Sequence, residues 1–417
     1  MLVAVGSMAE ARAAIERILT QNLVPFWFAR LRDPDAPGYR LNHDARGLWK
    51  GPAPKRLVKQ ARVLWFLSRL RQSGRAPAEC DALMAEGFDF LRRRLWDAEH
   101  GGFFWELDQR GATPTMPDKH LYGQAHALHG VAQYALATCD TAARAFADEI
   151  FETIEQRFRD PAFDGYCEFF RRDWSASPPE LCGYLGALPE FKLLNTHLHL
   201  LEAVTVYCTL SGNHLAQRRL GELVDIVGRR AIDERHGALT DGFERDWTPL
   251  RGARHDRVSY GHDIEAIYLL SEARACLGRP AVEGVETYRR LFDNAWRFGY
   301  GRDGGVYAAG PLGEPADDHR RIWWVQAEAL LGALTLYRLT GGPRYAGAFH
   351  ESVRWVMDRQ VDWTWGGWHA EIAPDSTPRG DKADAWKGPY HDGRAMIVAL
   401  EILEHLDRTA QAAADLA

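Results

Sequence analysis

The chain repeats one pattern six times: a helical segment, a loop of related composition and a second helical segment. Apolar residues recurring at i, i+3, i+4 and i+7 predict twelve helices. They span residues 8–24, 55–73, 78–96, 119–138, 141–159, 193–211, 214–231, 261–277, 280–299, 320–340, 343–359 and 391–407. Six helix pairs in one chain favour a closed ring. We therefore expect an all-α fold, an (α/α)6 barrel of six inner and six outer helices.

The loops after the odd-numbered segments share an early Asp and a Gly beside an aromatic or apolar residue. Examples are "DAEHGGFFWELDQRG" and "DPAFDGYCEFFRRDW". Asp and Gly turn the chain and a short extended piece follows, which predicts β-hairpin-like loops. No long Pro-, Ser- or Gly-rich linker interrupts the 417 residues, so we predict a single domain over residues 1–417.

Charge and hydropathy exclude several classes of partner. The net charge is −6 with both signs mixed throughout, so neither nucleic acid nor an anionic membrane is expected as a partner. No signal peptide and no apolar run of membrane-spanning length are present, and we expect a cytoplasmic protein. The cysteines are scattered, which favours reduced thiols over a disulfide frame or a zinc site; they are Cys80, Cys139, Cys167, Cys182, Cys208 and Cys276.

Polar residues interrupt the apolar helices at or near the starts of the even-numbered segments. If those segments are the inner helices, their polar clusters meet at one mouth of the barrel. The candidate site residues are Arg62, Tyr122, Asn195, His199, His262, Glu265, Trp324, Glu328, Trp386 and His391. Fifteen Trp serve either a large core or flat faces for sugar rings, and composition does not separate the two.

The stretch "FKLLNTHLHLLEA" offers a choice between metal ligands and helix residues. On a strand, His197 and His199 would share a face, as metal ligands often do. On a helix they diverge, while Asn195, His199 and Glu202 share a face. The apolar run continues for several turns and favours a helix, so we predict no metal site. His199 should then face the cavity, and His197 should be structural and have a hydrogen-bonding partner.

Two further motifs carry histidine. "GHDIE" places His262 and Glu265 three residues apart on a helix, where a carboxylate can fix the imidazole tautomer. The alternative is a surface ion pair of little importance. In "WKGPYHDGR", Pro389 places His391 near a helix start, where it is either an accessible catalytic group or a loop histidine without a role.

Aromatic and basic residues complete the pattern. "WWVQAE" puts Trp324 and Glu328 on one helix face, where the tryptophan either packs in the core or stacks on a sugar. Arg62 lies among apolar residues, so it must be paired or functional. No P-loop, GxGxxG after a strand, GxSxG or HExxH motif appears.

Together, "NTHLHLLEA", "SYGHDIEA", "WWVQAEAL" and "WKGPYHDGRA" closely resemble motifs of the N-acylglucosamine 2-epimerase superfamily, most of all its cellobiose 2-epimerase branch. "QARVLWFLSRL" resembles that branch's arginine helix. The resemblance implies an (α/α)6 barrel that acts on a free reducing sugar, without an organic cofactor. It implies His262 and His391 as the acid–base pair. It also implies substrate-binding or supporting roles for His199, Arg62, Asn195, Glu265, Trp324, Glu328 and Trp386. We add Tyr122 as a substrate-binding candidate. We expect a monomer or weak homodimer.

The sequence departs from that branch at several places. Gly388 and Asp392 stand where many members have Cys and Asn, and "SPPELCGYLGALPEFK" before the histidine helix is unusual. These differences leave open whether the substrate is a monosaccharide such as mannose or a disaccharide.

Four activities remain open at this stage. A 2-epimerase would need a base on each face of C2, whereas an aldose–ketose isomerase would need one base on the same site. An (α/α)6 glycoside hydrolase would need two carboxylates across the bond. A non-catalytic sugar-binding or inhibitor protein would need no histidine pair.

Overall fold

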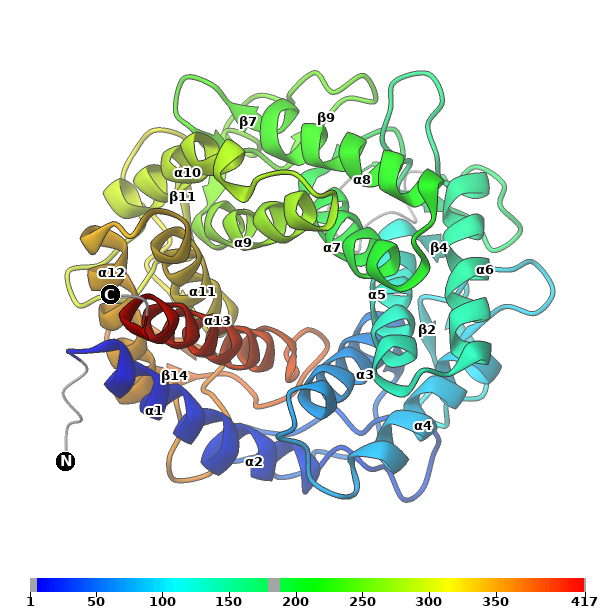
Figure 1. Ribbon diagram of the computed structural model, residues 1–417. Helices are drawn as coiled ribbons and strands as arrows, with labels where there is room; N and C mark the ends of the chain where they lie inside the picture. The colour runs from blue at the N-terminus through cyan, green and yellow to red at the C-terminus, as the bar shows by residue number, and fades with distance from the viewer. Residues whose placement is uncertain (1–5, 179–187, 416–417) are drawn as a thin grey trace.

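The computed structural model describes residues 6–178 and 188–415, and its inner layer is a ring of six helices (Figure 1). These are α3 (Leu57–Gln72), α5 (Leu121–Thr138), α7 (Leu194–Ser211), α9 (Tyr260–Cys276), α11 (Trp323–Thr340) and α13 (Tyr390–Asp415). Each packs against the next, and α13 packs against α3 to close the ring. Cys182 and part of "SPPELCGYLGALPEFK" lie outside the described residues.

The outer layer surrounds this ring. It consists of α1 (Met8–Ile18) with α2 (Val24–Phe28), α4 (Cys80–Phe90), α6 (Thr141–Arg157), α8 (His214–Asp225), α10 (Val285–Phe298) and α12 (Pro343–Trp355). Four outer helices lead into π-helical turns at Leu19–Leu23, Leu91–Leu95, Ile226–Arg230 and Val356–Gln360, and a 3-10 turn at Ala281–Gly284 precedes α10. The predicted all-α class and (α/α)6 barrel are confirmed.

The apolar core lies between the two layers of helices. Phe88 of outer α4 stacks on Tyr134 of inner α5, with ring centroids 4.7 Å apart. One unit further, Phe151 of α6 stacks on Tyr207 of α7 at the same distance of 4.7 Å. Because the apolar faces are used between the layers, the interior of the ring is left to polar side chains.

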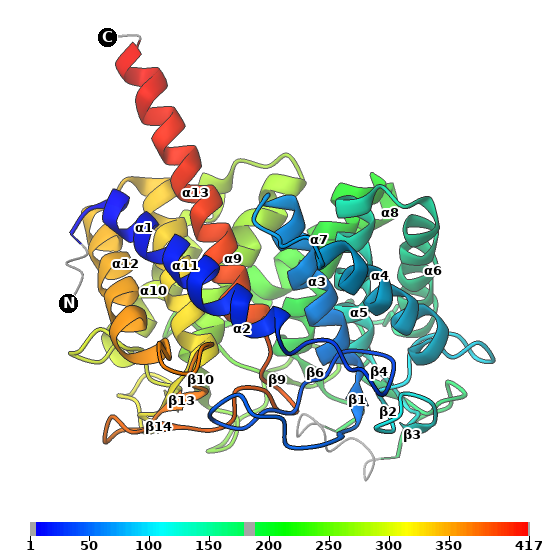
Figure 2. The same ribbon diagram turned by 90° about the horizontal axis from the view of Figure 1, so that it is seen from below.

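Short strands join neighbouring units at one end of the barrel (Figure 2). The strand before each of five inner helices, α3, α5, α7, α9 and α11, pairs antiparallel with a strand in the loop one unit later. The pairs are β1 (Lys55–Arg56) with β2 (Glu106–Leu107), β4 (Lys119–His120) with β5 (Phe169–Phe170), β6 (Lys192–Leu193) with β9 (Gly242–Phe243), β10 (Arg257–Ser259) with β11 (Ala309–Pro311), and β12 (Arg321–Ile322) with β13 (Glu371–Ile372). A bridge between His43 and Ala383 closes this outer belt.

The remaining strands extend this belt. β3 (Pro114–Met116) and β14 (Pro378–Arg379) each add a third strand, and β7 (Ile232–Asp233) forms a hairpin with β8 (Ala238–Leu239). Pairing before the helices also explains why α3 and α5 begin two residues later than predicted, since residues 55–56 and 119–120 are strands. At the opposite end, α13 continues beyond the predicted residue 407 and projects from the barrel (Figure 2).

The repeated Asp of the loops has a second task besides turning the chain. Asp97 accepts a hydrogen bond from the backbone N–H of Glu99, and its carboxylate also lies 2.9 Å from the Nζ of Lys119, just before α5. The same pairing of a loop Asp with a lysine before an inner helix recurs at Asp33–Lys55, Asp160–Lys192 and Asp362–Lys382. These pairs anchor the segments that precede four of the inner helices, α3, α5, α7 and α13.

Two observations bear on the expected environment. Cys80, Cys139, Cys167, Cys208 and Cys276 are free thiols. Among the described helices, none combines the length and the apolar character that crossing a bilayer requires.

We expect Gly130→Ala to destabilise the barrel by about 1–3 kcal/mol, because a Cβ at this position of α5 would lie 2.6 Å from the carbonyl oxygen of Ala61 in α3. Gly347 in α12 is the matched control. A Cβ there meets nothing within 4 Å, so Gly347→Ala should stabilise by roughly 0.5–1 kcal/mol through helix propensity. Urea unfolding measures both. Equal effects of the two variants would contradict the close approach of α3 and α5.

Candidate active site

Candidate residues from all six inner helices gather at the end of the barrel that carries the strands. A chain of ring contacts links five of them. The ring centroids of Tyr122 and His199 are 5.4 Å apart, and those of His199 and His391 are 6.5 Å apart. Trp324 lies 5.5 Å from His391 and 5.0 Å from His262. Side chains that are up to 269 residues apart in the sequence therefore form one cluster.

Arg62 of α3 lies within this cluster. Its Nη2 donates a hydrogen bond of 2.9 Å to the hydroxyl oxygen of Tyr122. Its guanidinium carbon lies 4.6 Å from the ring centroid of Tyr390, an aromatic contact that holds the cation inside the barrel. Arg62 therefore has partners, Tyr122 and Tyr390, as one of the two alternatives predicted from the sequence requires.

His391 has a carboxylate partner. Its Nδ1 lies 2.8 Å from Oε1 of Glu328, a residue of the neighbouring helix α11, and 3.9 Å from Oε1 of Glu265. Burial, reinforced by Arg62 and Arg394, holds the pKa of His391 well below its usual value. The imidazole is therefore neutral at pH 7, and Nε2 is the nitrogen left to face a ligand.

His262 is partly buried beside Trp324, and burial lowers its pKa against the opposing effect of Glu265. The expectation that Glu265 orients His262 differs from the structure. Oε1 of Glu265 accepts a hydrogen bond from Arg394, and Oε2 has no hydrogen-bond partner among the described residues. Of the two proposed bases, it is His391 whose imidazole a glutamate orients, through Glu328.

The two histidines of "NTHLHLLEA" separate as predicted. Nδ1 of His199 lies 3.1 Å from Oε2 of Glu202, and its ring faces the cluster. His197 is fully buried: Nδ1 lies 2.8 Å from the carbonyl oxygen of Leu193, and Nε2 accepts a hydrogen bond from the N–H of Tyr166. Burial lowers the pKa of His197 to about 3, so it is a neutral structural residue.

Arg394 of α13 also belongs to the cluster, although it was not among the candidate residues predicted from the sequence. Its guanidinium is fully buried and donates hydrogen bonds to Glu202 and Glu265, while Nη2 lies 2.8 Å from Oε1 of Glu328. Burial raises the pKa of Glu328 above its usual value, and the guanidinium of Arg394 opposes this effect. Arg394 follows Tyr390 by one turn on an apolar helix. An arginine at such a position could have been recognised from the sequence as a candidate site residue.

Several polar atoms of the cluster are left without partners. Oδ1 of Asn195, Nε of Arg62 and Oε2 of Glu265 are buried and have no hydrogen-bond partner among the described residues. Buried polar atoms are normally satisfied, so these atoms are available to a ligand rich in hydroxyl groups. Trp386 stands at the rim, 38% exposed, with its ring 6.5 Å from that of Trp105.

The family model described as N-acylglucosamine 2-epimerase (GlcNAc 2-epimerase) matches residues 38–395, which include every residue of this cluster. The chain belongs to the N-acylglucosamine 2-epimerase family. As its relatives' names indicate, this family member is an isomerase.

Two curated relatives and one solved structure illustrate the similarity. The cellobiose 2-epimerase of Bacteroides fragilis is 30% identical over 393 residues, covering 93% of this chain and 97% of that protein. The D-mannose isomerase of Pseudomonas cannabina pv. alisalensis is 28% identical over 340 residues, covering 76% and 77%. The structure of cellobiose 2-epimerase from Bacillus thermoamylovorans B4167 has a TM-score of 0.85 at 25% identity and covers 94% of this chain and 98% of that one.

This family member also brings together a trio that sequence spacing did not predict. One ligand atom each from Glu265, Glu328 and His391 lies within 4.8 Å of the others, as in some metal sites. Arg394 already contacts both carboxylates, however, so its cation takes the place that a metal ion would need. The donor set therefore does not fit a metal.

We expect treatment with EDTA, followed by gel filtration, to leave kcat/KM within about twofold of the untreated enzyme, because the trio is occupied by a guanidinium. Steady-state kinetics before and after treatment give the answer. A loss of activity that zinc or manganese restores specifically would contradict this assignment.

We expect Glu328→Gln to lower kcat roughly 10- to 100-fold with a small effect on KM, because the amide keeps the shape but cannot become the anion that stabilises an imidazolium at His391. The matched control is Glu272→Gln in α9, whose carboxylate lies 3.0 Å from Arg338 and outside the cluster. That control should retain normal kinetics. An unchanged kcat in Glu328→Gln would rule out the supporting role.

Proposed function

We propose that the chain is a sugar 2-epimerase that interconverts the glucose and mannose configurations at C2 of the reducing end of a free sugar. The single observation that supports it most is the placement of His262 and His391 on different inner helices, with their rings 5.0 and 5.5 Å from the same Trp324 ring. Two neutral imidazoles that flank one aromatic surface can reach opposite faces of a sugar carbon.

The reaction begins with the open-chain aldehyde, whose C2 hydrogen is acidic. One neutral imidazole removes that hydrogen as a proton, and the C–H electron pair forms the double bond of a cis-enediolate. The other imidazole, which has taken up a proton from solvent, donates it to C2 from the opposite face and inverts the configuration; the first imidazole then releases its proton to solvent, so both are neutral again. An imidazole has an ordinary pKa of about 6.5, so it can act in either direction near neutral pH.

The surrounding residues support this chemistry in distinct ways. Arg62 and His199 would stabilise the developing oxyanion, and Glu328 would stabilise the imidazolium of His391. Trp324 would stack on the sugar ring, and Asn195 would bind a hydroxyl group through its unpartnered oxygen. Tyr122 would hold Arg62, and Glu265 would keep Arg394 in place.

A cellobiose-type disaccharide is the favoured substrate, because the relatives at about 30% identity are cellobiose 2-epimerases and Trp386 offers a second aromatic surface at the rim. Mannose or glucose is the alternative. Isomerisation of mannose to the ketose is the second candidate activity, since D-mannose isomerases are also relatives and a proton returned to C1 requires only one base.

The proposal extends to the setting in which the enzyme works. We expect no required cofactor, a monomer or weak homodimer, and a cytoplasmic location in which the free thiols remain reduced. The net charge of −6 supports a small neutral sugar as partner, in preference to nucleic acid or an anionic membrane.

Incubation of the purified protein with cellobiose or mannose in heavy water distinguishes these activities. Solvent deuterium at C2 of an epimeric aldose supports epimerisation, and deuterium at C1 of a ketose supports isomerisation. Release of glucose from cellobiose would instead show a glycoside hydrolase. NMR spectroscopy of the products identifies the labelled carbon. If the protein binds the sugar without exchange or turnover, it is a binding protein and the proposal is wrong.

We expect His262→Asn and His391→Asn each to abolish epimerisation, because neither imidazole can cover the opposite face of the enediolate. The two variants should differ in half-reactions: one should lose deuterium wash-out from the starting sugar, and the other should lose delivery to the epimer. His405→Asn, an exposed histidine on the same helix as His391, is the control and should keep full activity. Circular dichroism checks folding. Near-normal turnover in both variants would overturn the two-base mechanism.

A further inference from the structure

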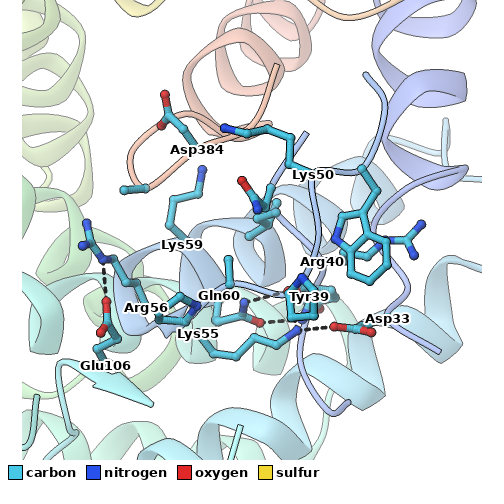
Figure 3. Close-up of a pocket in the computed structure, with 17 residues that line it drawn as sticks. Asp33, Tyr39, Arg40, Lys50, Lys55, Arg56, Lys59, Gln60, Glu106 and Asp384 are labelled. Carbon is cyan, nitrogen blue, oxygen red and sulfur yellow. Dashed lines mark hydrogen bonds and ion pairs between the residues drawn. The ribbon is translucent and has the colours of Figure 1, made fainter. Parts of the chain in front are cut away.

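A separate cavity of about 310 Å³ lies beside the first turn of α3, where the loop after α2 approaches the loop that carries Asp384 (Figure 3). Five basic and three acidic side chains line it. None of the histidines of the candidate active site lines this cavity. Its chemistry therefore needs an explanation of its own.

Most of the charge in this cavity is already neutralised by local pairs. Nζ of Lys55 lies 2.5 Å from Asp33, and Nε of Arg56 lies 2.8 Å from Glu106. Lys50 points to Asp381, at 2.6 Å. These three basic groups are therefore not free to bind a ligand strongly.

The third acidic residue of the cavity is also engaged. Oδ1 of Asp384 accepts hydrogen bonds from the backbone N–H groups of Trp386, at 2.6 Å, and Lys387, at 2.7 Å. This turn holds the carboxylate in its own loop. Asp384 attracts Lys59 electrostatically, but no hydrogen bond joins the two residues among those that the structure describes.

Lys59, in contrast, takes part in none of these ion pairs. Its side chain lines the cavity, it is only 4% exposed, and its Nζ has no hydrogen-bond partner within residues 6–178 and 188–415. A Cβ at position 388 would lie 2.9 Å from this Nζ, so Gly388 leaves the ammonium group room. A buried ammonium without a partner is costly, so this arrangement is stable only with compensation from a ligand or by loss of the proton.

Two more features of the same cavity favour negative charge. The guanidinium carbon of Arg40 lies 4.8 Å from the ring centroid of Trp49, and its Nε has no hydrogen-bond partner among the described residues. The first turn of α3 has no side-chain cap at Arg56, so the positive end of the helix dipole adds to the two basic groups.

The geometry points to a binding site for a small tetrahedral oxyanion, a phosphate group or its equivalent, held by Lys59 and Arg40 at the start of α3. Two basic groups without acidic partners suit a dianion, and a phosphate oxygen can accept from an ammonium and a guanidinium together. This inference does not rest on the proposed epimerase activity, because it concerns binding alone and a different cavity.

Sulfate is the probe of choice, because its charge does not change near neutral pH. We expect sodium sulfate, at constant ionic strength and pH 6, to bind the wild-type protein in isothermal titration calorimetry, and Lys59→Met to weaken binding at least tenfold. Lys50→Gln is the matched control: Lys50 lines the same cavity but is paired with Asp381, so its removal should change affinity no more than about threefold. Urea unfolding checks that Lys59→Met remains folded.

The pH dependence of binding provides a readout that a purely structural lysine would not give. The pKa of Lys59 is lowered to about 7, mainly by burial; Asp384 and Asp392 oppose this shift, whereas Lys387 and Arg62 contribute to it. The charged ammonium is therefore mostly present at pH 6 and mostly absent at pH 8. Sulfate should bind the wild-type protein up to about tenfold more weakly at pH 8 than at pH 6. Lys59→Met should lack this difference.

Further titrations identify the source of the anion. Tighter binding of glucose 6-phosphate than of inorganic phosphate would indicate a phosphorylated metabolite, and equal binding would indicate the free ion. The proposal is overturned if sulfate and phosphate do not bind, or if Lys59→Met binds them as tightly as the wild-type protein does. Neither result depends on whether the enzyme epimerises a sugar.

Discussion

The buried guanidinium of Arg394 is the interaction on which the rest of the active site depends. It contacts Glu202, Glu265 and Glu328, which come from three different inner helices. Removing the cation would leave three carboxyl groups buried side by side, and such a loss typically costs several kcal/mol. The guanidinium thus links the helices of the ring, and through Glu328 it also fixes the orientation of His391.

The same arrangement explains how the histidines that we propose as bases remain neutral near pH 7. In the interior of a barrel, burial alone disfavours the imidazolium form, and nearby arginines add to this effect. His391 is therefore neutral before it acts as a base. When its imidazole takes up a proton, the carboxyl group of Glu328 beside Nδ1 can stabilise the imidazolium. The polar interior that would weaken a helical bundle is tolerated because the apolar core lies between the two layers of helices.

Much of this could be predicted from the sequence, because helical periodicity and a six-fold repeat are local signals. The helical phase of these residues predicted that Arg62, His199, His262 and His391 lie in one cluster and that His197 points away from it. The structure agrees on both points. Helix starts were placed less well, since the residues before α3 and α5 pair as strands with loops one unit away.

Interactions between helices could not be predicted in this way. The partner of His391 is 63 positions away in the sequence, and the nearer pairing of Glu265 with His262, three residues apart, was the more obvious choice. Arg394 and Lys59 looked like ordinary basic residues, because only the three-dimensional fold shows which charges each one meets. Spacing along one helix gives no information about the neighbouring helix.

The belt of short strands has a consequence for how this architecture can diversify. Five of the loops at this end of the barrel are joined by backbone hydrogen bonds to the strand that precedes an inner helix of the preceding unit, while the proposed catalytic side chains themselves stand on helices. Loop residues between these anchor points can therefore be exchanged, lengthened or shortened during evolution without moving the proposed bases. A single catalytic apparatus can in this way come to serve sugars of different length, with selection acting on the loops one at a time.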